Sequence, residues 1–211
     1  LFPYTTLFRS IAETDVYLKL ECEQLTGSFK LRGAYNALAS LGADARARGV
    51  VAASAGNHGL GIAHAARELG IAATIFVPRT APAVKRDGIA RLGATIDATS
   101  DDYDIAHARA IEYAASKGLA FIDPCNDVTV IAGQGTAALE IVEELPSVRM
   151  VLLPVGGAGL LAGFGSLLRA VAPTVRIAGA QGDRSNAMAL ALEEGAVVPV
   201  GHEYTLADGL S

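Results

Sequence analysis

Short apolar runs alternate along the chain with longer segments in which apolar residues recur every three or four positions. The short runs predict buried strands over residues 16–20, 50–53, 72–77, 94–97, 119–122, 148–155 and 175–180. The longer segments predict helices that begin at Gly33 and, further along, cover residues 58–69, 82–92, 101–117, 135–144, 159–171 and 185–194, with Asp101 as the cap of the fourth. Strands that alternate with helices are typical of an α/β fold whose parallel sheets are flanked by helices.

Composition narrows the class of protein. The chain has 211 residues, of which 51% are hydrophobic and 18% charged, and this suits one or two globular domains. A net charge of −5, few aromatic residues and no Trp argue against a nucleic-acid partner. Residues 150–168 form an uncharged run of membrane length, but its proline and glycines favour a buried strand, a turn and a helix over a membrane span. Cys22 and Cys125 are expected to be free thiols in a reducing cytoplasm.

Lys30 lies between a predicted strand and a predicted helix, and it directly follows the aromatic Phe29. Partial burial lowers the pKa of a lysine, so that a neutral amine becomes available for a Schiff base. We therefore hypothesise that Lys30 forms a Schiff base with pyridoxal phosphate.

Residues 54–59 form a second candidate segment, at the end of a predicted strand, where open α/β sheets bind ligands. The Ser54 hydroxyl and the backbone amides can face an anion at a helix N-terminus. Asn57 can hydrogen-bond a ring oxygen or a carboxylate. His58 is interpreted either as a residue near the mouth of the site or as an ordinary polar residue at a helix start. The alternative is an ordinary helix cap with Asn57 in a left-handed turn.

Residues 155–160 form a third candidate segment, rich in glycine, whose amides can converge on a phosphate. The same residues fit a dinucleotide fingerprint, with Asp183 at a suitable distance for a ribose contact. This fingerprint is weak by itself, and it leaves NAD and other phosphates open.

Other polar residues give weaker indications of a functional site. Residues 134–136 are expected to start a helix and could lie near the pocket, and Cys125 is expected in a loop. The remaining histidines have no metal-ligand spacing and are expected to be structural or solvated: His64, His107 and His202.

Four motifs occur here in one order, over residues 28–33, 54–58, 133–136 and 154–161. Together they resemble the threonine dehydratases (threonine ammonia-lyases) and the related serine dehydratases, which are fold-type-II pyridoxal phosphate enzymes. The resemblance covers roughly residues 16–211. It favours the phosphate of pyridoxal phosphate over NAD as the ligand of the glycine-rich segment. It implies β-elimination from L-threonine or L-serine, which yields 2-oxobutanoate or pyruvate plus ammonia. It leaves isoleucine biosynthesis and threonine catabolism both open.

The resemblance also implies roles for single residues. Lys30 would carry the cofactor and act as the base at the substrate Cα, Phe29 would lie close to the pyridine ring, and Asn57 would hydrogen-bond its phenolic oxygen. The phosphate would be held by Gly156, Gly157, Ala158, Gly159 and Leu160. The substrate carboxylate would be held by the loop of Ser54, Ala55, Gly56, Asn57 and His58.

Three positions depart from related patterns. Related serine racemases carry a serine at the place of Ala55, where it acts as a second base; an alanine favours elimination over racemisation. Ala158 replaces a fourth glycine, and its methyl group is tolerable if φ is negative. Asp183 could be one ligand of a metal site, but its expected companion is Ala189, so no metal is predicted. Racemase, β-replacement enzyme and catalytically incompetent fragment remain the alternatives.

The resemblance divides the chain into two domains. Residues 11–45 and 131–211 would form a large, discontinuous cofactor-binding domain, and residues 46–130 a small domain that closes over substrate. Residues 1–10 do not fit the pattern and are predicted to be a non-native leader. The large domain is expected to be incomplete at its C-terminal side, where the partner of the pyridine nitrogen would lie. Family members imply a homo-oligomer that takes a small amino-acid substrate.

Overall fold

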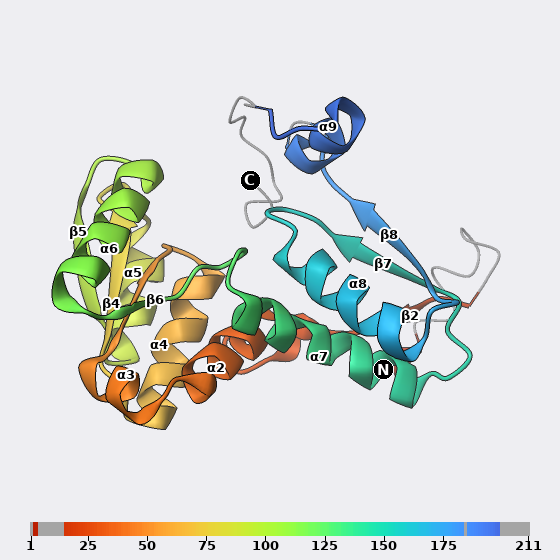
Figure 1. Cartoon of the computed structure of the whole chain (residues 1–211), viewed down its shortest axis with the longest axis horizontal. Coiled ribbons are helices and arrows are strands. Elements are labelled where there is room, and N and C mark those ends of the chain that lie inside the picture. The colour runs from red at the N-terminus through yellow and green to blue at the C-terminus, as the bar shows by residue number, and fades with distance from the viewer. Residues whose placement is uncertain (1, 4–14, 184, 199–211) are drawn as a thin grey trace.

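The computed structural model describes residues 2–3, 15–183 and 185–198. Within these ranges the chain forms a four-stranded and a two-stranded parallel sheet, each covered by helices, with two further helices packed between them (Figure 1). The α/β class with parallel sheets flanked by helices is therefore confirmed.

The four-stranded sheet has the order β5-β4-β3-β6 and is parallel throughout. Its strands are β3 (Val50–Ala53), β4 (Ala73–Pro78), β5 (Thr95–Ser100) and β6 (Ala120–Phe121). All four residues of β3 are buried, since helices cover both faces of the sheet. This double burial explains why β3 is a continuous apolar run rather than an alternating one.

Helices α4 (Asn57–Leu69) and α5 (Ala83–Arg91) cover one face of this sheet, and α6 (Tyr103–Lys117) covers the other. Alternate strand residues enter the two cores: Ile75 packs with α4 and α5, and its neighbour Phe76 packs with α6.

The chain reverses direction across the sheet at β3. It first adds β4 and β5 on one side of β3 and then returns to place β6 on the other side. The loops that follow β3 and β6 therefore leave neighbouring strands at the carboxyl edge, and open α/β sheets bind ligands at such switch points. Residues 54–56 follow β3 and residues 122–127 follow β6.

The two-stranded sheet pairs β7 (Met150–Pro154) with β8 (Arg176–Ala180), and α8 (Gly159–Val171) packs on it. Alternate residues of β7 are buried against this helix, with Val151 and Leu153 facing the core. Helix α9 (Ala187–Glu194) follows β8.

Helix α7 (Val128–Glu144) links the two halves, because it packs against both α2 (Lys30–Ser40) and α8 (Figure 1). Glycines permit both close approaches. A Cβ on Gly133 would lie 2.7 Å from the Cα of Gly33 in α2. A Cβ on Gly163 in α8 would lie 2.7 Å from the backbone nitrogen of Gly135.

Several helix boundaries differ from the sequence prediction. Helix α2 begins at Lys30 rather than at Gly33. Helix α7 begins at Val128 rather than at residue 135, because the Asp127 carboxylate accepts from the amides of residues 129 and 130. Asp102, not Asp101, caps α6 by accepting from a first-turn amide.

Some short elements were not predicted, namely helix α3 (Ala43–Arg48) and the 3₁₀ turn η1 (Glu21–Glu23). Strand β2 (Tyr17–Leu18) is shorter than the predicted 16–20 and pairs with β1 (Phe2–Pro3). Of the predicted leader at residues 1–10, the other positions, 1 and 4–10, lie outside the described residues.

The division into two domains stays a prediction. Among the described helices, none has the length and apolarity to cross a membrane.

Candidate active site

Lys30 is the first residue of α2, and Phe29 occupies the helix N-cap. The Lys30 ammonium group lies 5.3 Å from the centroid of the Phe29 ring, and both side chains are half-buried. Helix α4 presses on the same turn, since a Cβ on Gly61 would lie 3.2 Å from the Lys30 carbonyl oxygen. Lys30 is thus a lysine on a well-packed helix start, with an aromatic ring beside its amine.

The loop of residues 54–58 leaves the buried β3 and enters α4 at the switch point of the sheet. The Ser54 hydroxyl accepts a hydrogen bond from the Gly56 amide at 3.2 Å, so the serine folds back over its own loop. Asn57 is exposed and lies inside the first turn of α4, with negative φ. The alternative of an asparagine in a left-handed cap is therefore wrong, and the Asn57 amide is accessible to a ligand.

His58 does not lie at the mouth of a site, so the first of the two interpretations of this residue is wrong. Its ring is only 3% exposed, and Nε2 lies 3.0 Å from the carbonyl oxygen of Ile122. Burial lowers the pKa of His58 to about 4, and the charge of Lys30 lowers it further. A neutral ring bonded to a carbonyl carries its proton on Nε2. The other nitrogen, Nδ1, is then a buried acceptor with no partner within the described ranges.

The glycine loop, residues 155–159, connects β7 to the N-terminus of α8. The first amides of α8 have no acceptor within the helix and carry the positive end of its dipole, which suits an anion. Ala158 has φ +61° and ψ 2°, and it is the only non-glycine residue with positive φ in the described part of the chain. The condition under which a methyl group is tolerable here, a negative φ, is therefore not met, and the backbone holds a conformation that favours glycine.

Residues 122–127, the connecting loop, bring these segments together. Ile122 holds His58 at one end, and Cys125 contacts the glycine loop at the other: a Cβ on Gly157 would lie 2.5 Å from the Cys125 sulfur. The loop is organised by Asp123, whose Oδ1 accepts from the amides of Cys125 at 2.8 Å and Asn126 at 2.7 Å. Although burial opposes the shift, these hydrogen bonds lower the pKa of the Asp123 carboxyl.

Sequence reasoning treated this connecting loop only as a loop and missed its place beside the candidate site. A signal was present, because an Asp-Pro pair follows directly after a predicted buried strand.

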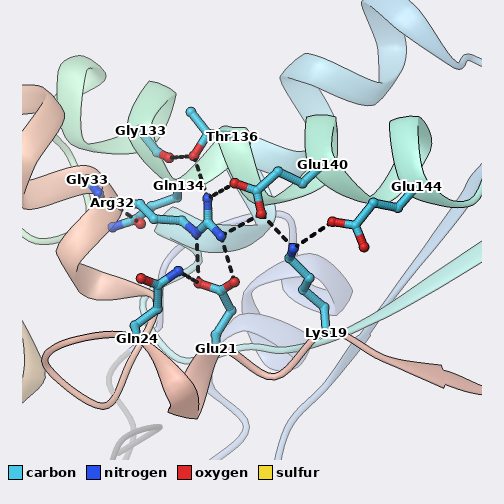
Figure 2. A network of polar contacts seen from close by, with 10 residues as sticks. All are labelled: Lys19, Glu21, Gln24, Arg32, Gly33, Gly133, Gln134, Thr136, Glu140 and Glu144. Atoms are coloured by element: carbon cyan, nitrogen blue, oxygen red, sulfur yellow. Dashed lines mark hydrogen bonds and ion pairs between the residues drawn. The ribbon is translucent and has the colours of Figure 1, made fainter. Parts of the chain in front are cut away.

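Arg32, two residues after Lys30, anchors α2 (Figure 2). Its guanidinium group forms paired hydrogen bonds with Glu21, at 2.7 and 2.8 Å, and with Glu140, at 2.6 and 2.8 Å. The remaining donor reaches the Thr136 hydroxyl at 3.1 Å, so that all five donors are used. Arg32 thereby ties the segment before Lys30 and helix α7 to the same turn of α2.

Lys19 extends this network along α7. Its ammonium group lies 2.6 Å from Glu140 and 3.4 Å from Glu144 (Figure 2). Hydrogen bonds from Arg32, supported by Lys19, lower the pKa of Glu140 to about 2. The carboxylate therefore stays ionised across the physiological range.

Residues 134–136 lie in the middle of α7, which corrects the prediction that they start a helix. Gln134 is fully buried, and its Oε1 accepts from the Gly33 amide at 3.2 Å. Thr136 donates to the carbonyl of Gly133 at 2.7 Å. This motif packs against α2, the helix that carries Lys30.

No group of three or more His, Cys, Asp or Glu residues within the described ranges is arranged to hold a metal ion, and Asp183 is exposed. A phosphorylated aldehyde fits the residues that are present. The glycine loop offers amides without bulky side chains, Lys30 offers an amine, and Asn57 offers an accessible amide.

The family described as "Pyridoxal-phosphate dependent enzyme" matches residues 2–211. The chain belongs to this family. It is 43% identical to the L-threonine ammonia-lyase of Thermotoga maritima over 208 residues, which is 99% of this chain and 52% of that protein.

Two solved structures are also similar. The processed form of threonine deaminase isoform 2 from Solanum lycopersicum is 37% identical, with a TM-score of 0.91, over 96% of this chain and 56% of that chain. Maize serine racemase is 32% identical, with a TM-score of 0.92, over 96% of this chain and 62% of that chain.

These findings confirm the resemblance to threonine dehydratases, the fold-type-II architecture and pyridoxal phosphate as the cofactor. The chain spans about half the length of the Thermotoga maritima ammonia-lyase. The roles of the individual site residues stay predictions.

Proposed function

We propose that the protein deaminates L-threonine or L-serine by β-elimination, with pyridoxal phosphate attached to Lys30. Loss of water across Cα and Cβ, followed by hydrolysis, converts the amino acid to 2-oxobutanoate or pyruvate and ammonia. The observation that carries the proposal is the placement of Lys30, half-buried at the start of α2 beside Phe29. The identity to a threonine ammonia-lyase over nearly the whole chain supports the reaction class.

The glycine loop and the first turn of α8 would hold the phosphate of the cofactor, with amides from Gly156, Gly157, Ala158, Gly159 and Leu160. When bound, the cofactor withdraws electrons from the substrate Cα and so makes its proton acidic. Lys30 would attach the cofactor and then move this proton as a general base. Phe29 would confine the ring, and Asn57 would donate to its phenolic oxygen.

The loop of residues 54–58 would hold the substrate carboxylate at the N-terminus of α4. Ser54, Ala55 and Gly56 would supply backbone and hydroxyl groups, and the accessible Asn57 would border the same space. His58, as a neutral group, would hold this loop in place through its hydrogen bond to the Ile122 carbonyl. The Ala55 methyl cannot transfer a proton, which favours elimination over racemisation.

Three further proposals concern the whole protein. The unit of residues 46–130 would close over bound substrate and exclude water from the reaction. The protein would form a homo-oligomer, as the family resemblance implies. It would act in the cytoplasm, which is consistent with the unpaired thiols of Cys22 and Cys125.

The test uses the protein encoded by the whole reading frame. Pyridoxal phosphate is added to the wild type and to Lys30→Ala, and the absorption spectrum is recorded before L-threonine and L-serine are supplied. We expect a cofactor band in the wild type that the variant lacks, and formation of a 2-oxo acid only by the wild type. A wild type that gives no band and no 2-oxo acid would overturn the proposal.

The same assay separates the rival activities. D-serine as the main product from L-serine would indicate a racemase, and a new β-substituted amino acid would indicate a β-replacement enzyme. The variant Ala55→Ser extends the comparison. It introduces a hydroxyl at the position that would face the side of Cα opposite to Lys30. We expect this variant to form more D-serine than the wild type does.

A further inference from the structure

Gln134 connects α7 to α2 by a single hydrogen bond inside the protein. Its side chain is 0% exposed, and its Oε1 accepts from the Gly33 amide at 3.2 Å (Figure 2). The approach is close, since a Cβ on Gly33 would lie 2.3 Å from Nε2 of Gln134. Only a glycine at position 33 lets the amide side chain lie flat against the helix.

Gly33 is the fourth residue of α2, so its amide is the first that a regular α-helix would pair with the carbonyl of the N-cap residue. The Arg32 amide donates to the Phe29 carbonyl at 3.0 Å, which is the acceptor that a regular α-helix would offer to Gly33. Gln134 therefore supplies the acceptor for Gly33. Because Lys30 begins the same turn, the bond fixes the position of its backbone relative to α7.

Gly135, the next residue of α7, contacts the helix that follows the glycine loop. A Cβ on Gly135 would lie 2.9 Å from the Gly163 carbonyl oxygen of α8. Helix α7 is therefore the common support of the two helices whose N-termini carry Lys30 and the candidate phosphate site. A shift of α2 on α7 would change the distance between the amine and that site.

Stability alone does not explain a glutamine at this place. Its Nε2 is buried and has no hydrogen-bond partner in the part of the chain that the structure describes. A buried donor without a partner is destabilising, and an apolar residue of similar shape would only exchange it for an unpartnered Gly33 amide, so stability gives no advantage to the glutamine.

We propose that Gln134 is a positioning residue, which sets the place of Lys30 on α7 through its hydrogen bond to the Gly33 amide. This inference rests on the function proposed above for Lys30. It deepens that function, because it assigns the buried motif of α7 a role in the attachment of the cofactor.

Two variants separate positioning from stability, and both are made in the protein from the whole reading frame. Gln134→Met keeps the size of the side chain but removes the acceptor and also the unpartnered donor. Gln134→Glu keeps an acceptor for Gly33 but places a carboxyl group in a fully buried site, which lowers stability. We expect the unfolding temperature of Gln134→Met to stay near that of the wild type, because the loss of the unpartnered donor offsets the loss of the acceptor for Gly33. That of Gln134→Glu should fall.

The functional readouts should follow the opposite order. Amide exchange at Gly33 should be about 5- to 10-fold faster in Gln134→Met, since one hydrogen bond is lost, and near wild type in Gln134→Glu. Pyridoxal phosphate should attach to Lys30 more slowly in Gln134→Met, as measured by borohydride trapping and peptide mapping, and at a near wild-type rate in Gln134→Glu.

Rates of attachment and exchange that simply follow the unfolding temperatures would overturn the inference, and so would wild-type exchange and attachment in Gln134→Met. A wild-type protein that never attaches the cofactor would refute the proposed function instead. The exchange at Gly33 needs no cofactor, so in that case it would still decide whether Gln134 holds this turn of α2.

Discussion

Arg32 and Glu140 form a bidentate ion pair between α2 and α7, with N–O distances of 2.6 and 2.8 Å. The Arg32 side chain is 11% exposed and also binds Glu21, so the planar fork of its guanidinium group is fully used. A lysine can supply charge but not this geometry. The contact holds the helix that begins at Lys30.

Arg32→Lys should therefore destabilise the protein although it keeps the charge. We expect a loss of about 2 kcal/mol in the free energy of unfolding, because part-buried carboxylates lose their second hydrogen bonds. The measurement is denaturant unfolding of the wild type and the variant. Arg67→Lys is the matched control, since Arg67 pairs only with Glu68 in the described structure and both are half exposed; it should change stability by less than about 0.5 kcal/mol. Equal effects of the two variants would contradict this account.

Acid should destabilise the protein in two successive ranges of pH. The pKa of His58 is about 4 in the folded protein and 6.5 in the unfolded chain, so the unfolded chain binds more protons between these values. Stability is therefore lost as the pH falls from about 6.5 to about 4. Glu140, with a pKa lowered to about 2, contributes stability above its ordinary value of 4.5, and this is lost as the pH falls towards 2.

His58→Gln should remove the first of these two losses and leave the second. The glutamine keeps a donor for the Ile122 carbonyl but does not titrate. Urea unfolding at a series of pH values checks this, with a flatter profile between pH 6.5 and 4 expected for the variant. An unchanged slope in that range would show that His58 is not the responsible group.

Ala158→Gly should stabilise the protein by about 0.5–1 kcal/mol. The backbone at Ala158 has φ +61°, which is unfavourable for a side chain with a Cβ and open to glycine. Ala162→Gly is the control within α8, where negative φ makes glycine the worse residue by about 1 kcal/mol. Thermal unfolding of both variants should show shifts of opposite sign, and a destabilised Ala158→Gly would count against a left-handed residue here.

Gly163→Ala should destabilise the protein by about 2–3 kcal/mol, because the new Cβ would lie 2.4 Å from the Ile131 carbonyl oxygen. Gly165→Ala, two residues along the same helix, should be neutral or stabilising by up to about 1 kcal/mol, because nothing lies within 4 Å of its Cβ position. Denaturant unfolding compares the two. If Gly163→Ala is tolerated as well as Gly165→Ala, then α7 and α8 are not packed as closely as the structure shows.

The sequence predicted the elements that have strong local patterns. The run of residues 50–53 is apolar throughout, which identified β3, and the glycine loop follows directly on an apolar strand. Helix α7 was predicted too short, because residues 128–135 contain β-branched residues and two glycines, which are weak helix formers. Only the capping carboxylate of Asp127 marks its true start.

Features that depend on tertiary contacts could not be predicted. Nothing local to Gln134 indicates that it is buried against α2, and nothing in a run of small residues shows that Ala158 has positive φ. The contact of Cys125 with the glycine loop likewise joins segments far apart in the chain. The buried position of His58 follows from the return of the chain to β6, beside β3.

The attachment of pyridoxal phosphate to Lys30 is the central claim, and chemical trapping tests it most directly. The protein from the whole reading frame is mixed with pyridoxal phosphate, reduced with borohydride and digested for peptide mapping. The sequence has four lysines, at positions 19, 30, 85 and 117. We predict that the reduced adduct forms on Lys30 in preference to the other three lysines and to any other lysine of that protein. An adduct spread evenly over these lysines, or concentrated on another one, would contradict the account.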